Sequence, residues 1–361
     1  MQIELPISKS IANRWLMLQA IHGDELMPVS CSMPNDVRMM SKAIGLLGER
    51  RELRIDIGNC GTAMRFLTAY CAQLEGQTTI LDGLERMHHR PIGQLVDALR
   101  EIGADIEYLS KEGFPPLKIK GCILDKHRIV TINNPQSTQF VSALLLIGVN
   151  VQTNSTSPYI YITQEVIKQY QLSPFSFHLT VEKDWSAAAF WYEYVALHGG
   201  EIKLPGLHKE SLQGDKIVAD IFAHLGVHTE YTAEGITLSP IAYSEASYSP
   251  LSGRPIAAQA ASHSKILAQD FGSCPDLYPA VALTCERLGI ELHATGVESL
   301  PLKESDRLRA VAEHHADADH RMAMALLIAG YEVDDTTCIS KSYPQFLEHF
   351  HQLQENNCLH S

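Results

Sequence analysis

Basic and hydroxyl side chains gather where short loops lead into predicted helices. The segment PISKSIANR places Lys9 and Ser10 at a helix start and Arg14 one turn later. Backbone N–H groups and the helix dipole attract an anion at such a position, and the two cations add full charges. The segment indicates a phosphate or carboxylate site, although alone it also fits a capped surface helix with solvated basic residues.

Three further segments share this character. In GNCGTAMR, Gly58 and Gly61 let the backbone approach a ligand at the start of a helix. RMHHRPIG places Arg90 before Pro91, and proline is favoured at the first helical position, so Arg90 is expected at a helix start. NPQSTQF supplies groups suited to sugar hydroxyls or phosphate oxygens, namely Ser137, Thr138 and Gln139.

The last third of the chain concentrates charge beside apolar sequence. The segments LKESDRL, DHRMAMA and CISKSYP supply Lys303, Glu304, Asp306, Arg307, Asp319, His320, Arg321 and Lys341. The apolar residues of MAMALLI follow directly, which is not typical of a solvated charge run. We therefore expect these charges at the rim of a hydrophobic core.

The segment EHHADADH offers a competing interpretation. Its His, Asp and Glu side chains could ligate a transition metal. No partner spacing such as HExxH is present, and the segment mixes a possible helix end with a loop. We therefore do not expect this segment to hold a metal.

The elements that must position these residues follow from hydrophobic periodicity. Helices are expected at 11–21, 64–74, 92–102, 138–147, 187–197, 216–225, 277–288, 320–329 and 345–353. Strand-like runs alternate with them, and the order strand, glycine turn, loop, helix, glycine, strand occurs in both 78–109 and 201–232. This pattern favours layered α/β lobes.

Composition limits the partners and the compartment. A chain of 361 residues is expected to form two domains of about 150 to 200 residues each. A net charge of -13 argues against nucleic acid or an anionic membrane as partner. The eight cysteines form no CxxC pair, and neither a signal core nor a bilayer-length apolar run is present. A cytoplasmic protein is expected.

Taken in order, these segments resemble the enolpyruvylshikimate-phosphate synthase family (3-phosphoshikimate 1-carboxyvinyltransferases). The matching text includes LPISKSIANR, DVRMM, GNCGTAMRFLTA, ERMHHRPIGQLVDALREIGA, FPPLKIKG, STQFVSALLL, SPYI, VEKDWSAAAF, LQGDKIVADIFAHLG, CPDLYPAVA, LKESDRL, DHRMAMA and CISKSYPQF. The resemblance implies an α/β protein with two lobes of the inverse α/β-barrel type, built from repeated βαβαββ units. One lobe would span 8–181, and the other would join 1–7 to 182–361.

The same resemblance implies the ligands. Shikimate 3-phosphate would contact Lys9, Ser10, Arg14, Ser137, Thr138, Gln139, Tyr159, Asp276 and Lys303. Phosphoenolpyruvate would contact Lys9, Gly61, Arg90, Gln139, Arg307, Arg321 and Lys341. A ring of planar cationic forks suits a ligand that carries both a phosphate and a carboxylate.

The implied reaction is addition followed by elimination, in the shikimate pathway of aromatic amino-acid biosynthesis. Asp276 is the candidate near the sugar 5-hydroxyl, and Glu304 and Lys9 are the candidates for proton transfer. Lys341 and the arginines would stabilise the leaving phosphate. This reaction requires neither a metal nor an organic cofactor. The expected partners are the two small-molecule substrates, and a monomer is expected.

Several departures from the family pattern predict a shortened member. Strands are expected to be missing before GNCGT, between Tyr170 and Val181, and between His314 and Asp319, and 243–265 reads as a loop rich in Ala and Ser. Phe66 stands where the family usually has proline. Two alternatives stay open. One is a non-catalytic anion-binding relative, and the other is the sister transferase acting on UDP-N-acetylglucosamine, whose reactive cysteine has no counterpart in ERMHHRPIG.

Overall fold

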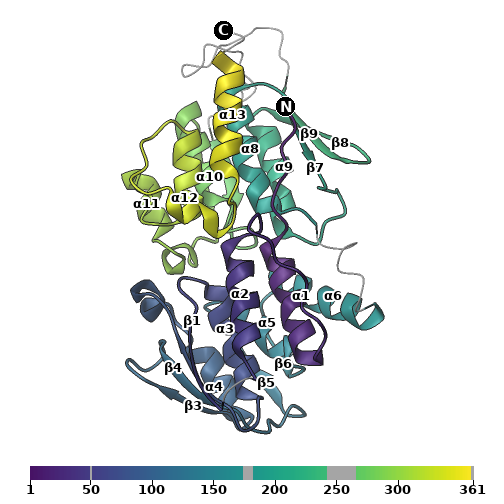
Figure 1. Ribbon diagram of the computed structural model, residues 1–361. Helices are drawn as coiled ribbons and strands as arrows, with labels where there is room; N and C mark the ends of the chain where they lie inside the picture. The colour runs from purple at the N-terminus through teal and green to yellow at the C-terminus, as the bar shows by residue number, and fades with distance from the viewer. Residues whose placement is uncertain (49–50, 174–181, 242–265, 359–361) are drawn as a thin grey trace. The chain divides into compact units, whose positions relative to one another are not determined.

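The computed structural model describes residues 1–48, 51–173, 182–241 and 266–358 (Figure 1). The chain divides into two compact units. The first unit comprises Lys9–Cys31 and Asn35–Val181, and the second comprises Met1–Ser8, Ser32–Pro34 and Glu182–Ser361. Both units mix helices and sheets, which confirms the predicted α/β class. The inverse barrel and the lobe boundaries at 8–181 stay predictions.

The first unit alternates helices with short strands. Its α-helices are α1 (Lys9–His22), α2 (Asn35–Leu46), α3 (Gly61–Ala72), α4 (Gly93–Glu101), α5 (Thr138–Leu146) and α6 (Pro158–Leu172), and η1 (Glu85–His89) is a 3-10 helix. Its strands are β1 (Glu52–Asp56), β2 (Thr78–Asp82), β3 (Asp105–Tyr108), β4 (Leu117–Lys120), β5 (Ile129–Thr131) and β6 (Asn150–Gln152). The helices predicted at 11–21, 64–74, 92–102 and 138–147 are confirmed as α1, α3, α4 and α5.

The largest sheet of the first unit has the strand order β1-β2-β4-β3. β1 and β2 run parallel, while β4 pairs antiparallel with both β2 and β3. Buried Ile55 and Leu81 are paired across β1 and β2. In Figure 1, α3 and α4 lie beside this sheet. The order β1, α3, β2, α4, β3, β4 is the βαβαββ order that the resemblance implies.

The second unit contains the remaining elements. Its helices are α8 (Trp185–His198), η2 (Gly214–Ile217), α9 (Val218–His224), α10 (Tyr278–Leu288), η4 (Leu300–Leu302), α11 (Arg307–Glu313), α12 (His320–Ile328), η5 (Thr337–Lys341) and α13 (Phe346–Cys358). Its strands are β7 (Ile202–Pro205), β8 (Val227–Tyr231), β9 (Gly235–Pro240), β10 (Ile266–Asp270) and β11 (Glu291–Thr295). The five helices predicted in this part of the sequence are confirmed as α8, η2 with α9, α10, α12 and α13.

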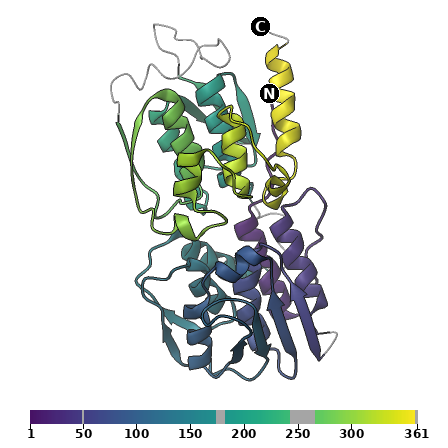
Figure 2. The same cartoon turned by 90° about the vertical axis from the view of Figure 1, so that its left-hand side faces the viewer.

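Helix α8 forms the centre of the second unit. It is buried along nearly its whole length and contacts α9, α10 and α12 (Figure 1). The ring of Trp191 stacks on Phe346 of α13, with ring centroids 5.3 Å apart. Gln2 forms a parallel bridge to Lys203 of β7, so the N-terminal residues belong to this unit. Figure 2 also shows the N-terminus beside the yellow helix α13.

The antiparallel strands of the two units follow the same order. β7, β9 and β8 form a sheet with β9 in the middle, as β4 lies between β2 and β3 in the first unit. The repeat predicted from 78–109 and 201–232 is therefore confirmed. In addition, β10 with β11 and β5 with β6 form parallel pairs. None of the helices in the described part of the chain is long and apolar enough to cross a membrane.

One prediction about a helix start is wrong. Pro91 was expected at the first helical position, with Arg90 beside it. Instead Arg90 follows η1 in an extended conformation, and α4 begins two residues beyond Pro91, at Gly93. Ile92 is the N-cap residue, its φ of -141° lies outside the helical range, and its backbone N–H donates to the carbonyl of Gly113. The helix start therefore depends on the conformation of Ile92, which the proline signal does not determine.

Two of the segments in which strands were expected to be missing lie largely within the described residues. Among the residues described between α2 and α3, β1 is the only strand or helix, and residues 314–319 turn directly from α11 into α12. His314, Asp317 and Ala318 adopt positive φ angles in this turn, an uncommon conformation for residues other than glycine. The segments 174–181 and 242–265, which contain the other two predicted departures, lie outside the described residues.

Candidate active site

The first turn of α1 presents Lys9 and Ser10, as predicted. The Nζ atom of Lys9 lies 3.3 Å from Oδ2 of Asp36, which is in the first turn of α2. Both side chains are largely buried, so this ion pair fixes the Lys9 ammonium near the N-terminus of a 14-residue helix. An anion at this helix start would compete with Asp36 for Lys9.

Arg14 is more deeply buried than the sequence suggested. Its guanidinium donates to the carbonyls of Ser10 and Tyr159 at 2.7 and 3.0 Å, and to the hydroxyls of Thr163 and Ser142 at 2.7 and 3.2 Å. Burial lowers the pKa of Arg14 to about 10. These bonds tie together the backbone of two residues predicted to bind the sugar phosphate. Contact between Arg14 and a ligand stays a prediction.

Gly61 and Arg90 lie against each other. A β-carbon placed on Gly61 would be 2.6 Å from an Nη atom of Arg90, so only glycine fits there without displacing the guanidinium. Arg65, one turn along α3, donates to the carbonyls of Gly61 at 3.3 Å and Pro91 at 2.8 Å. Arg65 therefore supports both predicted ligand residues, although the sequence reasoning did not single it out as a site residue.

The start of α5 is joined to α3 by a side-chain hydrogen bond. The Ser137 hydroxyl caps α5 by accepting from the Gln139 backbone N–H at 3.3 Å. The Gln139 side-chain amide donates to the Thr62 hydroxyl at 2.9 Å. This bond orients Gln139 beside Gly61, the residue that precedes Thr62. Tyr159 lies in the first turn of α6, which is capped by a serine two residues before it.

In the second unit, Arg307 is the most constrained cation of the candidate site. Its guanidinium contacts Asp319 and Asp276 at 2.8 Å each and Glu304 at 3.3 Å, and the side chain is 1% exposed. Burial by itself would lower the pKa of Arg307, but the three carboxylates outweigh it and raise this pKa. Arg307 therefore stays charged and fixes the positions of both predicted proton-transfer carboxylates.

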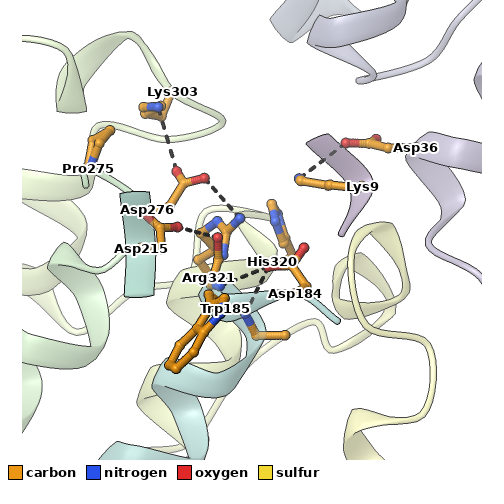
Figure 3. Close-up of polar contacts among 12 residues, drawn as sticks. Lys9, Asp36, Asp184, Trp185, Asp215, Pro275, Asp276, Lys303, His320 and Arg321 are labelled. Carbon is orange, nitrogen blue, oxygen red and sulfur yellow. Dashed lines mark hydrogen bonds and ion pairs between the residues drawn. The ribbon is translucent and has the colours of Figure 1, made fainter. Parts of the chain in front are cut away.

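Asp276 connects three cations. Besides Arg307, it contacts Arg321 through an Nη atom at 2.9 Å and Lys303 through Nζ at 3.6 Å (Figure 3). Burial lowers the pKa of Lys303, and the Asp276 carboxylate opposes this shift. Lys341 contacts the other carboxylate, Glu304, at 3.0 Å. The structure thus brings together the six residues of this part of the chain that the resemblance assigns to ligands or catalysis, from Asp276 to Lys341.

Three buried carboxylates were missed as site residues. Asp319 was expected at the rim of the core or as a metal ligand, but it accepts hydrogen bonds from Arg307 and from the Arg321 backbone N–H at 2.8 and 2.9 Å. Asp184 caps α8, and Asp215 accepts a hydrogen bond from Ser186 in the first turn of that helix. The signal for Asp184 and Asp319 is an aspartate directly before an apolar helix, which is typical of an N-cap.

The alternative of a metal site finds no support in the described residues. They contain no group of three or more His, Cys, Asp or Glu side chains arranged to hold an ion. His314 instead contacts Glu286 at 2.9 Å, and His315 contacts Asp317 at 3.0 Å. These are exposed pairs next to the turn between α11 and α12.

The charges of the candidate residues in each unit limit the chemistry that these residues can carry out. In the second unit, buried guanidinium groups hold carboxylates that could accept protons, and lysines stand next to them. In the first unit, helix starts and cations could receive phosphate or carboxylate oxygens. Each unit thus carries groups suited to an anionic ligand, and the second unit adds carboxylates suited to acid–base chemistry.

Comparisons with known proteins give a consistent family. A family described as EPSP synthase (3-phosphoshikimate 1-carboxyvinyltransferase) matches residues 1–315 and 311–350. A 3-phosphoshikimate 1-carboxyvinyltransferase of Bacteroides fragilis is 37% identical over 405 aligned positions, which cover 95% of this chain and 93% of the relative. The protein of the same name from Colwellia psychrerythraea is 29% identical, with 98% and 96% covered.

A solved structure shares the fold. An EPSP synthase of Acinetobacter baumannii matches with a TM-score of 0.63 and 18% identity, over 98% of this chain and 95% of that chain. The alignment with the Bacteroides relative is longer than the 361 residues of this chain, so the relative contains segments that this chain lacks. Because the family match and the relatives cover nearly the whole sequence, this chain belongs to the EPSP synthase family.

Proposed function

We propose that this chain transfers the enolpyruvyl group of phosphoenolpyruvate to the 5-hydroxyl of shikimate 3-phosphate and releases phosphate. The relatives that it matches carry the name of this transferase. The observation that carries the proposal is the Arg307 cluster, in which one buried guanidinium holds both Asp276 and Glu304. A protein that only bound anions would need the cations but not two carboxylates fixed among them.

The ligand residues are proposed from the motifs. For shikimate 3-phosphate they are Lys9, Ser10, Arg14, Ser137, Thr138, Gln139, Tyr159, Asp276 and Lys303. For phosphoenolpyruvate they are Lys9, Gly61, Arg90, Gln139, Arg307, Arg321 and Lys341. The contact of Arg90 with Gly61 and the bond of Gln139 to Thr62 support this grouping, because they place three of these residues at one helix start.

The reaction would proceed in two steps. In the first, the 5-hydroxyl oxygen attacks the central carbon of phosphoenolpyruvate, the hydroxyl proton passes to Asp276, and the methylene carbon accepts a proton from Glu304 or Lys9. In the second, the bond to the phosphate oxygen breaks while the methyl group returns a proton, which leaves the enolpyruvyl ether. Lys341 and the arginines stabilise the charge of the departing phosphate.

The proposal also covers the partners and the compartment. Both sets of ligand residues lie in one chain, so a monomer suffices for activity. Cys71, Cys274 and Cys285 are buried thiols that form no disulfide, which supports a reducing cytoplasm. The two substrates are small anions, and the net charge of -13 disfavours nucleic acid and anionic membranes as additional partners.

A phosphate-release assay tests the function directly. The purified chain is given phosphoenolpyruvate with shikimate 3-phosphate, and in parallel with UDP-N-acetylglucosamine. We expect phosphate release only with shikimate 3-phosphate. Release with the nucleotide sugar would indicate the sister transferase. Binding of both shikimate-pathway ligands without release would indicate a non-catalytic relative.

A further inference from the structure

Asp215, in η2, is a buried carboxylate with no role in the proposed reaction. Its side chain is 3% exposed, and its Oδ2 atom accepts a hydrogen bond from the Ser186 hydroxyl. Among the described residues, its Oδ1 atom has no hydrogen-bond partner. A buried, half-satisfied carboxylate is costly, so packing alone does not account for this residue.

Charged and titratable groups face Asp215 from each neighbouring element. Asp184 approaches from the start of α8, Asp276 and Cys274 from the loop before α10, and Arg321 from α12. Figure 3 shows Asp215, Asp276 and Arg321 directed toward one another. Arg321 therefore stands among three carboxylates and pairs with Asp276 at 2.9 Å.

Burial and the nearby charge of Asp276 disfavour a negative charge on Asp215. Burial, followed by the charge of Asp276, raises the pKa of Asp215 to about 7, against the effects of Arg321 and the Ser186 hydroxyl. Two close carboxylates do not ionise independently, because the charge on one opposes ionisation of the other. Near neutral pH the pair can thus hold one proton.

We propose that Asp215 is a positioning residue that carries a proton beside Arg321 and so leaves this arginine able to bind an anionic substrate. The inference rests on the proposed function, in which Arg321 binds phosphoenolpyruvate. When Asp215 loses its proton, a further negative charge faces Arg321. Affinity for the anion then falls, so the KM for phosphoenolpyruvate rises with pH.

The first test compares KM profiles between pH 5.5 and 8.5. For the wild type, KM for phosphoenolpyruvate is expected to rise above about pH 7 by up to tenfold per pH unit. Asp215→Asn, which resembles the protonated acid, should lack the rise in KM that ionisation of Asp215 causes. Asp220→Asn is the matched control, because Asp220 is exposed on the adjoining helix α9. The KM profile of Asp220→Asn should follow that of the wild type, because this variant keeps Asp215. Any effect of substrate ionisation on KM is the same in all variants.

Ser186→Ala provides a second variant. The Ser186 hydroxyl donates to the charged form of Asp215, so its removal should move the KM inflection to higher pH. A profile of Asp215→Asn that rises like the wild type, or an unmoved inflection in Ser186→Ala, would overturn the inference. A wild type without phosphate release would instead overturn the proposed function.

A measurement of unfolding is independent of turnover. The pKa of Asp215 is raised in the folded chain above its ordinary value of 3.8, so the unfolded chain gives up this proton first. Relative to Asp215→Asn, the wild type should lose stability between about pH 4 and 7, by tenfold in the unfolding equilibrium constant per pH unit. A difference that does not change with pH would contradict the proton on Asp215 even in an active enzyme.

Discussion

In the second unit, each cation of the candidate site has a carboxylate partner; these cations and carboxylates are called the second-unit cluster. Lys303, Arg307 and Arg321 contact Asp276, and Lys341 contacts Glu304. A bound phosphate or carboxylate has to compete with these partners, and one hydrogen bond to a charged group contributes roughly 1.5 to 3 kcal/mol. The carboxylates therefore act in two ways: they orient the cations, and they weaken the binding of anions.

Replacing the two carboxylates by amides separates these effects. Asp276→Asn and Glu304→Gln should each lower kcat by about 10²- to 10⁴-fold, the usual contribution of a positioned acid or base. Phosphoenolpyruvate should bind Asp276→Asn at least as tightly as the wild type, because a competitor for Arg321 has lost its charge. Phosphate-release kinetics and calorimetry measure the two quantities.

The control for these variants is Glu298→Gln. Glu298 is an exposed residue that follows β11 and has no assigned role in the candidate site. Its substitution makes the same chemical change as Glu304→Gln. Its kcat should equal that of the wild type. If both cluster variants turned over within a few-fold of the wild type, Asp276 and Glu304 would have no part in proton transfer.

Glu193 allows a prediction about stability rather than activity. It lies fully buried in α8, and among the described residues neither carboxylate oxygen has a hydrogen-bond partner. Burial raises the pKa of Glu193 well above its ordinary value of 4.5. The folded chain thus retains a proton that the unfolded chain loses, and stability falls as pH rises above about 4.5.

Removing this carboxyl should remove that pH dependence. Glu193→Gln should gain stability over the wild type by about 1.4 kcal/mol per pH unit above pH 5, until the folded-state pKa is reached. The exposed substitution Glu201→Gln serves as control and should show no such trend. Denaturant unfolding at a series of pH values measures both, and parallel curves for Glu193→Gln and the wild type would contradict the prediction.

At the scale of elements, periodicity predicted the helices well but their boundaries less well. Apolar residues at helical intervals specify a buried face, so α3, α5 and α12 could be predicted from sequence alone. The start of α4 could not, because it depends on the non-helical backbone conformation of Ile92, for which Pro91 gives no signal. Helix α6 was missed as an element, although Ser157 and Pro158 form an N-cap and first-turn pair.

The residues of the candidate site also differ in whether the local sequence predicts them. Cations at helix starts, such as Lys9, carry a local signal because the helix dipole and loop glycines are visible in sequence. The supporting residues Arg65 and Asp215 do not, because each has a partner that is distant along the chain, Pro91 for Arg65 and Ser186 for Asp215. Such contacts arise only when separate elements fold together.

The start of α3 leads to a prediction for an element. In Gly61→Ala, the new methyl group would displace the Arg90 guanidinium, because the atoms would be 2.6 Å apart. We expect the KM for phosphoenolpyruvate to rise about tenfold or more, equivalent to losing part of one charge-assisted contact. Stability should change little, since the far end of a flexible side chain gives way.

The matched control is Gly45→Ala in the last turn of α2. A β-carbon at Gly45 meets nothing within 4 Å. This substitution should leave KM unchanged and stabilise the fold by roughly 0.5 to 1 kcal/mol, because alanine is the better helix former. An unchanged KM in Gly61→Ala would show that Arg90 does not need its observed position to bind the substrate.

At the scale of the whole molecule, the proposed ligand residues are divided between two units of one chain. Shikimate 3-phosphate is assigned Lys9 and Ser10 in the first unit and Asp276 and Lys303 in the second. A ligand that contacts both sets orders residues of both units when it binds. The second ligand then binds residues that are already ordered, so its binding does not carry that free-energy cost again. The second substrate should therefore bind more tightly after the first.

This coupling is measurable by calorimetry. We expect phosphoenolpyruvate to bind at least tenfold more tightly when shikimate 3-phosphate is saturating, which corresponds to a coupling free energy of about 1.4 kcal/mol. Thermodynamic reciprocity requires the same factor when the ligands are added in the opposite order. In a double variant with Lys9→Ala and Lys303→Ala, which removes one proposed contact from each unit, the factor should fall toward one. Equal phosphoenolpyruvate affinities with and without the sugar phosphate would show that the two units bind their ligands independently.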